Sequence, residues 1–315
     1  EKKPVVIPVA LGLVGKGGDL PLTSISPALK AGGVVVLDQP SLSITFTDLP
    51  EAPTPSLLRG FSAPVRLELD LADGELLRLF NADSDSFNRW QALQTVATRA
   101  LVRAGKGDQS TLDATATALA EAFSGFLAGP ALADPAFAAQ VLRLPAPADI
   151  AREIGRDVDP DTVHGAHRRL SAAIGSTLAE QLASLRERLA ERGPYSPAAT
   201  PAGRRALRNE ALGLIALGAP AEGARLSLAQ FAEADNLTDR LAALAAMTLI
   251  PGAEREDLIA RFGELYAREP LVLDKWLMAQ ALIADAGTLD RVKGLLRHPA
   301  FSLGNPNRVR ALLGG

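Results

Sequence analysis

The chain has 315 residues, of which 47% are hydrophobic and 22% are charged, so it is long enough for one to three domains with buried cores. Its 33 basic and 36 acidic residues give a net charge of -3, and no dense basic run occurs, which argues against a nucleic-acid partner. Cysteine is absent, which excludes a disulfide framework and thiolate chemistry and fits a reducing cytoplasm.

Charged residues, glycine or proline interrupt every apolar run, so none approaches the roughly 20 residues that a membrane span needs. We therefore expect no membrane partner. The first residues, Glu1-Lys2-Lys3-Pro4, contain no methionine and lead directly into an apolar run, which is typical of neither a signal peptide nor a natural start. This pattern favours a pair of domains taken from a longer protein.

Residues 1–72 have the pattern of β-structure. The apolar run from Val5 to Val14 ends in a glycine-rich turn at 15–19, and this predicts a hairpin. Apolar and polar residues alternate at 42–46 and again at 65–71, which predicts strands with one buried and one wet face. Short strands separated by Gly and Pro predict a small antiparallel sandwich of the size of an immunoglobulin-like module.

From Asp73 onward the apolar spacing changes to three and four, which indicates helices. A stripe of apolar residues follows a Ser84-Asp85-Ser86 cap and predicts a helix as far as residue 104. Further helices are expected at 111–128, 135–144, 147–155 and 160–192, followed by a proline-rich joint at 193–201.

The last third of the chain has a regular spacing. Predicted helix starts recur about every 17 residues, so pairs of helices would repeat about every 34 residues, within the range of helical-repeat proteins. Such units bury their apolar faces by stacking. The predicted fold is therefore mainly α with an N-terminal all-β domain: an immunoglobulin-like β-sandwich (1–72) followed by a right-handed αα-superhelix of ARM/HEAT type (73–315), truncated at its C-terminus. The predicted starts are Gly203, Pro220, Thr238, Glu254, Leu271, Thr288 and Asn305.

No constellation of residues predicts a metal or catalytic site. His164 and His167 are three residues apart, whereas metalloprotease helices use a spacing of four with an intervening glutamate, so a solvated helix face is expected. The glycines between Gly12 and Gly18 lack the Gly-Lys-Ser/Thr ending of a phosphate loop and are interpreted as a hairpin turn. A nucleophilic cysteine and a G-x-S-x-G motif are both absent.

The C-terminal stretch HPAFSLGNPNRVRALLGG contains a predicted helix start at Asn305-Pro306. Arg308 and Arg310 follow at once, and the helix dipole disfavours positive charge in a first turn. We interpret this cost as a sign that the two arginines have a function.

Several short motifs resemble bacterial aminopeptidase N, the zinc-dependent alanyl aminopeptidase of the gluzincin type, and they occur in the order of that family. Each motif is short, and their common order carries the resemblance. H-E-x-x-H and G-x-M-E-N are missing, so the resemblance covers the family's back half and none of its catalytic half. The motifs are Phe61-Ser62-Ala63-Pro64-Val65, Asp85-Ser86-Phe87-Asn88-Arg89-Trp90, Leu207-Arg208-Asn209, Glu233-Ala234-Asp235-Asn236-Leu237-Thr238-Asp239, Asp274-Lys275-Trp276, Gly294-Leu295-Leu296 and Asn305-Pro306-Asn307-Arg308-Val309-Arg310.

The resemblance implies a parent enzyme that removes single N-terminal residues from peptides with a zinc-activated water. The zinc and its ligands would belong to a thermolysin-like domain outside this chain. These 315 residues would form the wall and lid of the enzyme's cavity, bind no cofactor and catalyse nothing alone. Peptide substrate would reach them only through the parent's catalytic domain.

The resemblance also implies a site. The second arginine of the family's N-P-N-R-x-R turn lines the substrate pocket on the C-terminal side of the cleaved bond, and Arg310 matches that position. A guanidinium at a cavity wall can hold a peptide carboxylate or carbonyl. Arg308 is the second candidate for pocket lining. Asp235 stands where the family has Asn, which changes the hydrogen bonds that this side chain can make.

Two other classes remain open from the sequence. A stand-alone helical-repeat scaffold that binds a partner protein on its concave face fits the composition and the periodicity equally well. A non-catalytic relative of the peptidase would differ only in residues outside this chain. We expect a monomer, because stacking of the repeats leaves no long apolar face over.

Overall fold

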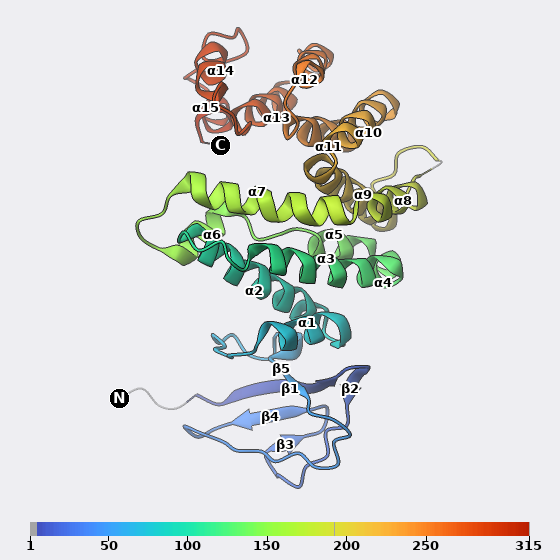
Figure 1. Cartoon of the computed structure of the whole chain (residues 1–315), viewed down its shortest axis with the longest axis vertical. Coiled ribbons are helices and arrows are strands. Elements are labelled where there is room, and N and C mark those ends of the chain that lie inside the picture. The colour runs from blue at the N-terminus through green and yellow to red at the C-terminus, as the bar shows by residue number, and fades with distance from the viewer. Residues whose placement is uncertain (1–4, 192, 315) are drawn as a thin grey trace. The chain divides into compact units, whose positions relative to one another are not determined.

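The structure, a computed structural model, describes residues 5–191 and 193–314, and the chain divides into two compact units. The first unit contains residues 1–130 and 143–167, and the second contains 131–142 and 168–315. All strands precede the α-helices, as predicted (Figure 1).

Strand β1 (Ile7–Gly15) is the centre of the sheet in the first unit (Figure 1). It pairs antiparallel with β2 (Gly18–Leu20), β4 (Val34–Leu37) and β5 (Thr54–Leu57). Strand β3 (Leu29–Lys30) pairs antiparallel with β4 at the edge. Gly15 is opposite Gly18 across the tight turn, so the predicted hairpin is confirmed.

Two predicted strands are not strands in the structure. Residues 42–46 keep the alternation of half-buried and exposed side chains but join no ladder. Residues 65–71 are also outside any strand, and Val65, Leu67 and Leu69 are exposed. A strand needs a ladder of hydrogen bonds to a partner edge. Beside 42–46, the Thr47 amide donates to the Thr23 carbonyl and the Ser24 hydroxyl donates to the Thr45 carbonyl, which is too few bonds for a ladder, and residues 65–71 join no ladder in the described part of the chain.

The helices of the first unit pack beside the sheet. Helix α1 (Asp73–Ala82), which lies in the predicted helical region but was not predicted as a separate helix, contacts β1 and β5, and the predicted α2 (Ser86–Gly105) and α3 (Leu112–Ala128) pack against it. Helix α6 (Pro147–Ile154) contacts α2. The largest fully buried side chains of this unit are Phe80, Leu93, Leu101, Leu112, Leu119, Phe123, Leu127 and Ile150.

The second unit contains the repeated helices. The predicted starts from residue 220 onward agree with the structure to within one residue, whereas α9 begins at 199 rather than 203. The single helix predicted at 160–192 is two helices that separate at Leu178. The helices are α4 (Pro130–Ala133), α5 (Pro135–Val141), α7 (Pro160–Thr177, shared with the first unit), α8 (Ala179–Arg188), α9 (Ala199–Gly218), α10 (Pro220–Glu233), α11 (Leu237–Thr248), α12 (Ala253–Leu265), α13 (Pro270–Ala281), α14 (Thr288–Leu295) and α15 (Pro306–Leu313).

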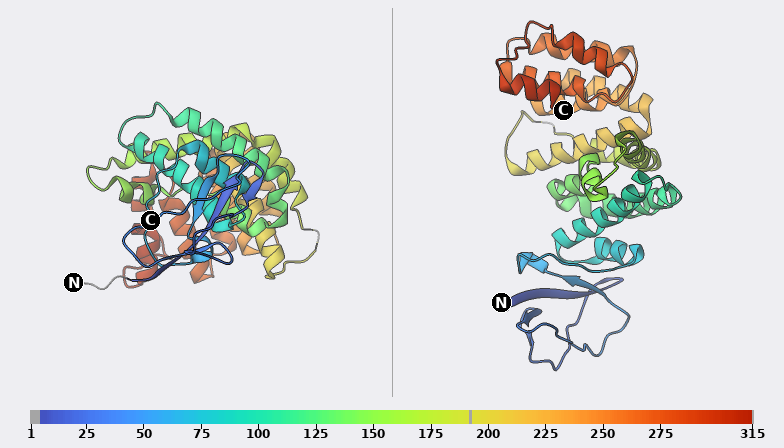
Figure 2. Two further views of the ribbon diagram at one scale, coloured as in Figure 1. Left: turned by 90° about the horizontal axis from the view of Figure 1, so that it is seen from below. Right: turned by 90° about the vertical axis from the view of Figure 1, so that its left-hand side faces the viewer.

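These helices stack on their neighbours in the chain. Helix α9 contacts α10 and α11, helix α11 contacts α12 and α13, and α13 contacts α14 and α15 (Figures 1 and 2). Contacts to the next helix and to the one after it are typical of stacked repeats. One apolar core runs through the stack and includes Leu212, Leu244, Met247, Leu258, Phe262 and Leu277.

Two glycines allow α7 and α9 to touch at their backbones. A Cβ added at Gly218 would lie 2.0 Å from the Ser176 amide nitrogen, and one added at Gly175 would lie 2.1 Å from the Leu214 carbonyl oxygen. Gly218→Ala is therefore expected to lower the free energy of unfolding by about 1–3 kcal/mol, because the helices must separate. The midpoint of urea unfolding, followed by circular dichroism, measures it.

Gly213→Ala is the matched control on the same helix. A Cβ at Gly213 meets no atom within 4 Å, so this change is expected to leave the packing intact. It should stabilise the helix by about 0.5–1 kcal/mol, because alanine is a better helix former than glycine. Equal effects of the two substitutions would contradict the close approach of α7 and α9.

Candidate functional site

Arg308 is buried and holds α15 to α13. Its Nε lies 2.6 Å from Oδ1 of Asp274 as an ion pair. Nη1 donates to the Ala300 carbonyl at 2.8 Å and Nη2 donates to the Pro270 carbonyl at 3.0 Å. Asn305 caps the helix by accepting from the amides of Asn307 and Arg308. The first arginine of the predicted pair is thus fully engaged inside the chain.

Arg310 is exposed, and its guanidinium makes no hydrogen bond or ion pair to any residue in the described ranges. Residues two apart on a helix do not face each other, so the structure does not bring the two arginine side chains together. Arg310 is available to a group outside the described chain. The lining of a substrate pocket by Arg308 and Arg310 stays a prediction.

The helix dipole acts differently on the two arginines from what the sequence suggested. Helix α15 ends at Leu313, so Arg310 lies in its last turn, where positive charge is favoured. Arg308 does lie in the first turn, and the carboxylate of Asp274 offsets its charge there. The unfavourable interaction of positive charge with the start of the helix dipole therefore concerns Arg308 alone, and the ion pair with Asp274 offsets it.

The Asp274-Lys275-Trp276 motif has a structural role at the same place. Trp276 is buried, and its Nε1 donates to the Ile259 carbonyl at 2.8 Å. The His298 ring lies 5.2 Å from the Trp276 ring, between centroids. With Asp274 paired to Arg308, this motif joins α12, α13 and α15 into one packed layer.

Two other family motifs meet around Gln230, a buried side chain of α10. Its Nε2 donates to Oδ1 of Asn209 and to the Asp239 carbonyl, each at 2.9 Å. Asn209 in turn donates to Oδ1 of Asp239 at 3.0 Å. The Leu207-Arg208-Asn209 motif is thus joined to the motif at 233–239 through a residue that the sequence did not single out.

Arg186 completes this network and was also missed. Its Nη2 donates to Oε1 of Gln230 at 3.0 Å and its Nη1 donates to the Arg208 carbonyl at 2.6 Å. Burial, and next the charge of Arg208, lower the pKa of Arg186 to about 10, so it stays protonated at neutral pH. Helix α8 carries several acidic and basic residues, and nothing in the sequence distinguishes the buried Arg186 from its exposed neighbours.

The substitution at Asp235 is compatible with this turn. The Tyr195 amide donates to Oδ2 of Asp235 and Asn236 donates to Oδ1, each at 3.0 Å. The hydrogen bond from Asn236, followed by that from the Tyr195 amide, lowers the pKa of Asp235. Both of these contacts need an acceptor at residue 235, so the Asp235 carboxylate makes them without the amide donor of an asparagine.

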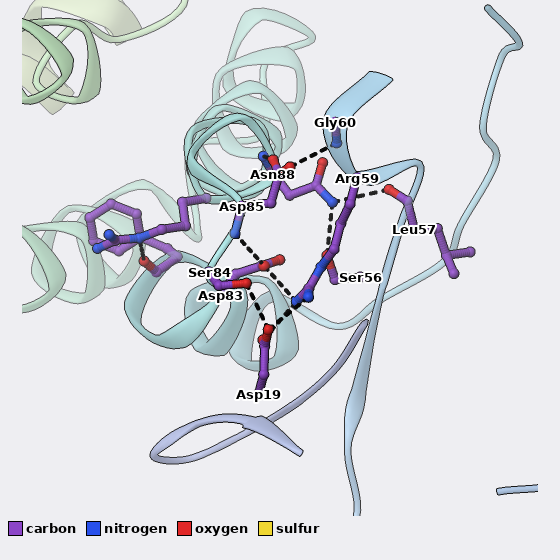
Figure 3. A network of polar contacts seen from close by, with 11 residues as sticks. Asp19, Ser56, Leu57, Arg59, Gly60, Asp83, Ser84, Asp85 and Asn88 are labelled. Carbon is purple, nitrogen blue, oxygen red and sulfur yellow. Dashed lines mark hydrogen bonds and ion pairs between the residues drawn. The ribbon is translucent and has the colours of Figure 1, made fainter. Parts of the chain in front are cut away.

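A second polar network joins the sheet to α1 and α2 in the first unit, and Figure 3 shows it around Arg59. Nη1 and Nη2 of Arg59 donate to the two carboxylate oxygens of Asp19 at 2.8 and 2.7 Å. Nη2 also donates to Oδ1 of Asp83 at 2.7 Å, and the Asp83 side chain is 0% exposed. A guanidinium thus bridges the β-hairpin and the end of α1.

The motif beginning at Asp85 holds the same joint (Figure 3). Asp85 caps α2 by accepting from the Asn88 amide, and its other oxygen accepts from the Gly60 amide at 2.9 Å. Nδ2 of Asn88 donates to Oγ of Ser56 and to the Leu57 carbonyl. These bonds secure a turn whose Leu58, Gly60 and Phe61 have positive φ.

Gly12, in the glycine-rich run of β1, leaves room for Arg59. A Cβ at Gly12 would lie 2.0 Å from Cζ of Arg59. The absence of a side chain at Gly12 therefore allows the guanidinium to lie against the strand, and the interpretation of this run as a hairpin rather than a phosphate loop agrees with the structure.

Acid is expected to weaken this joint. The hydrogen bond from Arg59 is the largest influence on Asp19 and, against some burial, lowers its pKa below the ordinary value of 3.8. A depressed folded-state pKa stabilises the fold above the unfolded-state value, and this stabilisation is lost as the pH falls from about 4 through the folded-state pKa. Urea unfolding of the wild type and of Asp19→Asn between pH 2 and pH 6 measures how much the ionised Asp19 adds to the free energy of unfolding.

The two curves of stability against pH should converge at low pH and separate above about pH 4, with the wild type more stable. A constant difference across the range would contradict the role of the ionised Asp19. The Asp19 side chain is 37% exposed, so solvent screens the ion pair and the effect is expected to be modest.

The described residues contain no group of three or more His, Cys, Asp or Glu side chains that could hold a metal ion. His164 is exposed on α7, while burial, followed by the charge of His164, lowers the pKa of His167. Within the described ranges, no helix is both long and apolar enough to cross a membrane. The polar motifs described above hold helices and strands of the chain together.

Residues 73–315 match the family described as "Domain of unknown function (DUF3458_C) ARM repeats", and residues 1–70 match "Domain of unknown function (DUF3458) Ig-like fold". The chain belongs to this family. The predicted order of an immunoglobulin-like fold followed by ARM-type helical repeats is thereby confirmed.

Curated relatives of this DUF3458 chain are named aminopeptidase N. The protein of Caulobacter vibrioides is 37% identical over 96% of this chain and 34% of its own length. That of Escherichia coli is 32% identical over 100% of this chain and 36% of its own length. The chain thus spans about a third of the relatives that it matches, and the resemblance to the C-terminal region of that family is confirmed.

A solved structure has the same fold. The crystal structure of Legionella pneumophila aminopeptidase A in complex with aspartic acid has a TM-score of 0.78 to this chain, at 23% identity. The match covers 98% of this chain and 36% of that one. At this identity the likeness establishes the fold alone.

Proposed function

We propose that this chain is the C-terminal part of a zinc-dependent aminopeptidase that removes N-terminal residues from peptides. The observation that carries the proposal is the match of nearly the whole chain to proteins named aminopeptidase N, at up to 37% identity. In the proposed enzyme, this chain forms the wall and lid of the substrate cavity and is inactive by itself. Its lack of cysteine suits the cytoplasm.

The described residues do not fit a zinc site. The chain has three histidines and no cysteine, and within the described ranges no three potential ligands come together. In the proposed enzyme, the zinc, its ligands and the water that attacks the first peptide bond belong to polypeptide outside this chain. What this chain supplies is shape and charge around the part of the peptide beyond that bond.

Arg310 is the proposed contact with the substrate. It is exposed, has no partner among the described residues, and sits on a helix that Arg308 holds rigidly against α13. Its guanidinium is a fixed positive charge with several donors, suited to a peptide carbonyl or terminal carboxylate on the C-terminal side of the cleaved bond. Arg308 supports Arg310 by positioning α15.

The size and activity of the native protein test the proposal. An antibody raised against this chain should detect, in the source cells, a species far larger than 33.0 kDa. The purified species should hydrolyse alanyl p-nitroanilide, lose this activity to a chelator and regain it with zinc. The 315-residue chain alone should not hydrolyse the anilide. A native species of 33.0 kDa would overturn the proposal in favour of a stand-alone scaffold.

Arg310→Ala in the larger species tests the site. The KM for peptides of three or more residues should rise about tenfold with little change in kcat, because uniform binding is lost. The KM for the anilide, which has no residues beyond the cleaved bond, should stay the same. Arg297→Ala is the matched control, since Arg297 is also exposed. Equal effects on both substrates would contradict the proposed contact.

A further inference from the structure

A small polar pocket lies in the second unit, beside the network around Gln230. It is found where helices α9, α10 and α11 meet (Figure 1), and residues 189–191 also line it. Its volume of about 320 Å³ is at the lower end of the roughly 300–1,000 Å³ that ligand pockets have. The motifs at 207–209 and 233–239 both contribute to the lining. Their structural role described above leaves two of their charged side chains unused.

Arg208 is the first of these side chains. Its guanidinium donates no hydrogen bond and forms no ion pair to any residue that the structure describes, and its Nε is buried from solvent. A buried donor without an acceptor costs free energy, so Arg208 calls for a further group in the pocket. The planar fork of a guanidinium matches a carboxylate, with which it forms two parallel hydrogen bonds. Arg208 therefore indicates a ligand that carries a carboxylate.

Arg205 lines the same pocket but is fully engaged. Its Nη1 donates to Oε2 of Glu191 at 3.0 Å, and its Nη2 donates to the Ser196 carbonyl at 2.7 Å. Its Cζ lies 4.6 Å from the centroid of the Tyr195 ring. Residues three apart on a helix share a face, so Arg208 lies on the same side of α9. Among the described lining residues, Arg208 is thus the guanidinium that is left for a ligand.

Carboxylates without a cationic partner line the pocket as well. Glu233 is exposed at the last position of α10 and forms no ion pair in the described ranges. Asp235 and Asp239 accept hydrogen bonds from amide groups and likewise have no ion pair within those ranges. Because carboxylates outnumber guanidiniums in the described lining, a simple anion such as phosphate would be repelled. A simple cation would leave Arg208 without an acceptor.

A ligand with both charges meets both requirements. We propose that this pocket binds a free α-amino acid in its zwitterionic form. The carboxylate of the ligand accepts from Arg208, and its ammonium group donates to the carboxylates of Glu233, Asp235 and Asp239. A metal ion does not suit the same place, because the described residues contain no group of three or more potential ligands that could hold one. The small volume of the pocket favours a single amino acid over a longer peptide.

Three small molecules test the proposal directly. L-Alanine is the probe, because its methyl side chain adds little to the two charged groups. Isothermal titration calorimetry should show saturable binding of L-alanine to the 315-residue chain. N-acetyl-L-alanine lacks the ammonium group and L-alaninamide lacks the carboxylate, so each should bind about tenfold more weakly or worse, because a charged group of the pocket loses its partner.

Variants of the chain locate the binding. Arg208→Gln removes the fork and should weaken the binding of L-alanine about tenfold or more. Glu233→Gln should weaken it about two- to fivefold, because ion pairs of exposed groups are weak. Glu264→Gln is the matched control, since Glu264 is also exposed near the end of a helix of the stack, α12, but does not line the pocket. Both glutamates are exposed, so their variants should fold, and circular dichroism checks all three.

The other outcomes overturn the proposal. Absence of saturable binding would mean that the pocket is no amino-acid site. Equal affinity for L-alanine and L-alaninamide would mean that Arg208 holds no carboxylate, and binding that Arg208→Gln leaves unchanged would place the amino acid elsewhere on the chain. The inference goes beyond the proposed function. Binding requires no hydrolysis of peptides, so a negative result alongside a zinc-dependent larger enzyme would remove this site and leave the proposed function standing.

Discussion

Replacing Arg308 with alanine is expected to lower the free energy of unfolding of the second unit by about 3–5 kcal/mol, the usual cost of removing one partner of a buried ion pair. The Arg308 and Asp274 side chains are only 7% and 19% exposed. The variant leaves the Asp274 carboxylate without its charge partner and the carbonyls of Pro270 and Ala300 without their donor. Urea unfolding followed by Trp276 fluorescence, in a Trp90→Phe background, measures the loss.

Arg310→Ala is the matched control two residues away. Arg310 is exposed and unpaired among the described residues, so its loss should change stability by no more than about 0.5 kcal/mol. The double variant Arg308→Met and Asp274→Leu should recover much of the stability lost in the single variant, because no buried charge then remains alone. Equal effects of Arg308→Ala and Arg310→Ala would contradict the structural role of Arg308.

The helical repeats could be predicted from the sequence because their starts are marked locally. Pro220 and Pro270 occupy first helical positions, and Asn236 and Asn305 accept amides as caps. Each signal depends only on neighbouring residues. The regular spacing of these signals then predicts stacking, since one short helix pair cannot bury its apolar face alone.

The bounds of helix α1 could not be predicted, because its ends carry no such local signals. Ala72, at its N-cap, has no side chain that can accept an amide, and Gly74 lies in its first turn. Its position is instead fixed by packing, because α1 contacts β1, β5, α2 and α3. Contacts between elements distant in sequence leave no local pattern from which to predict them.

The strands at 42–46 and 65–71 show the limit of periodicity. The alternation correctly identified which side chains share a face, as the lining of one surface groove by Val65, Leu67 and Leu69 shows. It could not identify the partner edge, which a strand needs for its hydrogen bonds. A pattern within one segment describes that segment's faces and carries no information on its neighbours.

The sequence predicted part of the candidate site, namely its motifs, and not the buried residues that connect other motifs. The motifs at 274–276 and 305–310 indicated a place where conspicuous residues meet, and the structure joins them through Arg308 and Asp274. Arg186 and Gln230, which connect two other motifs, carried no signal, because a polar residue is recognisable as buried only once its surroundings are known.

Replacing Arg59 with methionine should be as costly as the loss of Arg308, at about 3–5 kcal/mol in the first unit, because Arg59 bridges two carboxylates. Asp83 is the decisive partner: its side chain is 0% exposed, and its Oδ2 has no hydrogen-bond partner in the described part of the chain. Without the guanidinium, the buried Asp83 carboxylate loses its ion-pair partner and keeps the hydrogen bond from the Asp85 amide. Urea unfolding followed by Trp90 fluorescence, in a Trp276→Phe background, measures the effect.

Two comparisons make this prediction specific to burial. Arg66→Met removes an ion pair with Glu68 in which both side chains are more than 80% exposed, so it should cost less than about 1 kcal/mol. Adding Asp83→Leu to Arg59→Met should return part of the lost stability, because it removes the stranded carboxylate. If the double variant were as unstable as the sum of its single variants, Arg59 and Asp83 would not be coupled, which would contradict the role of their buried ion pair.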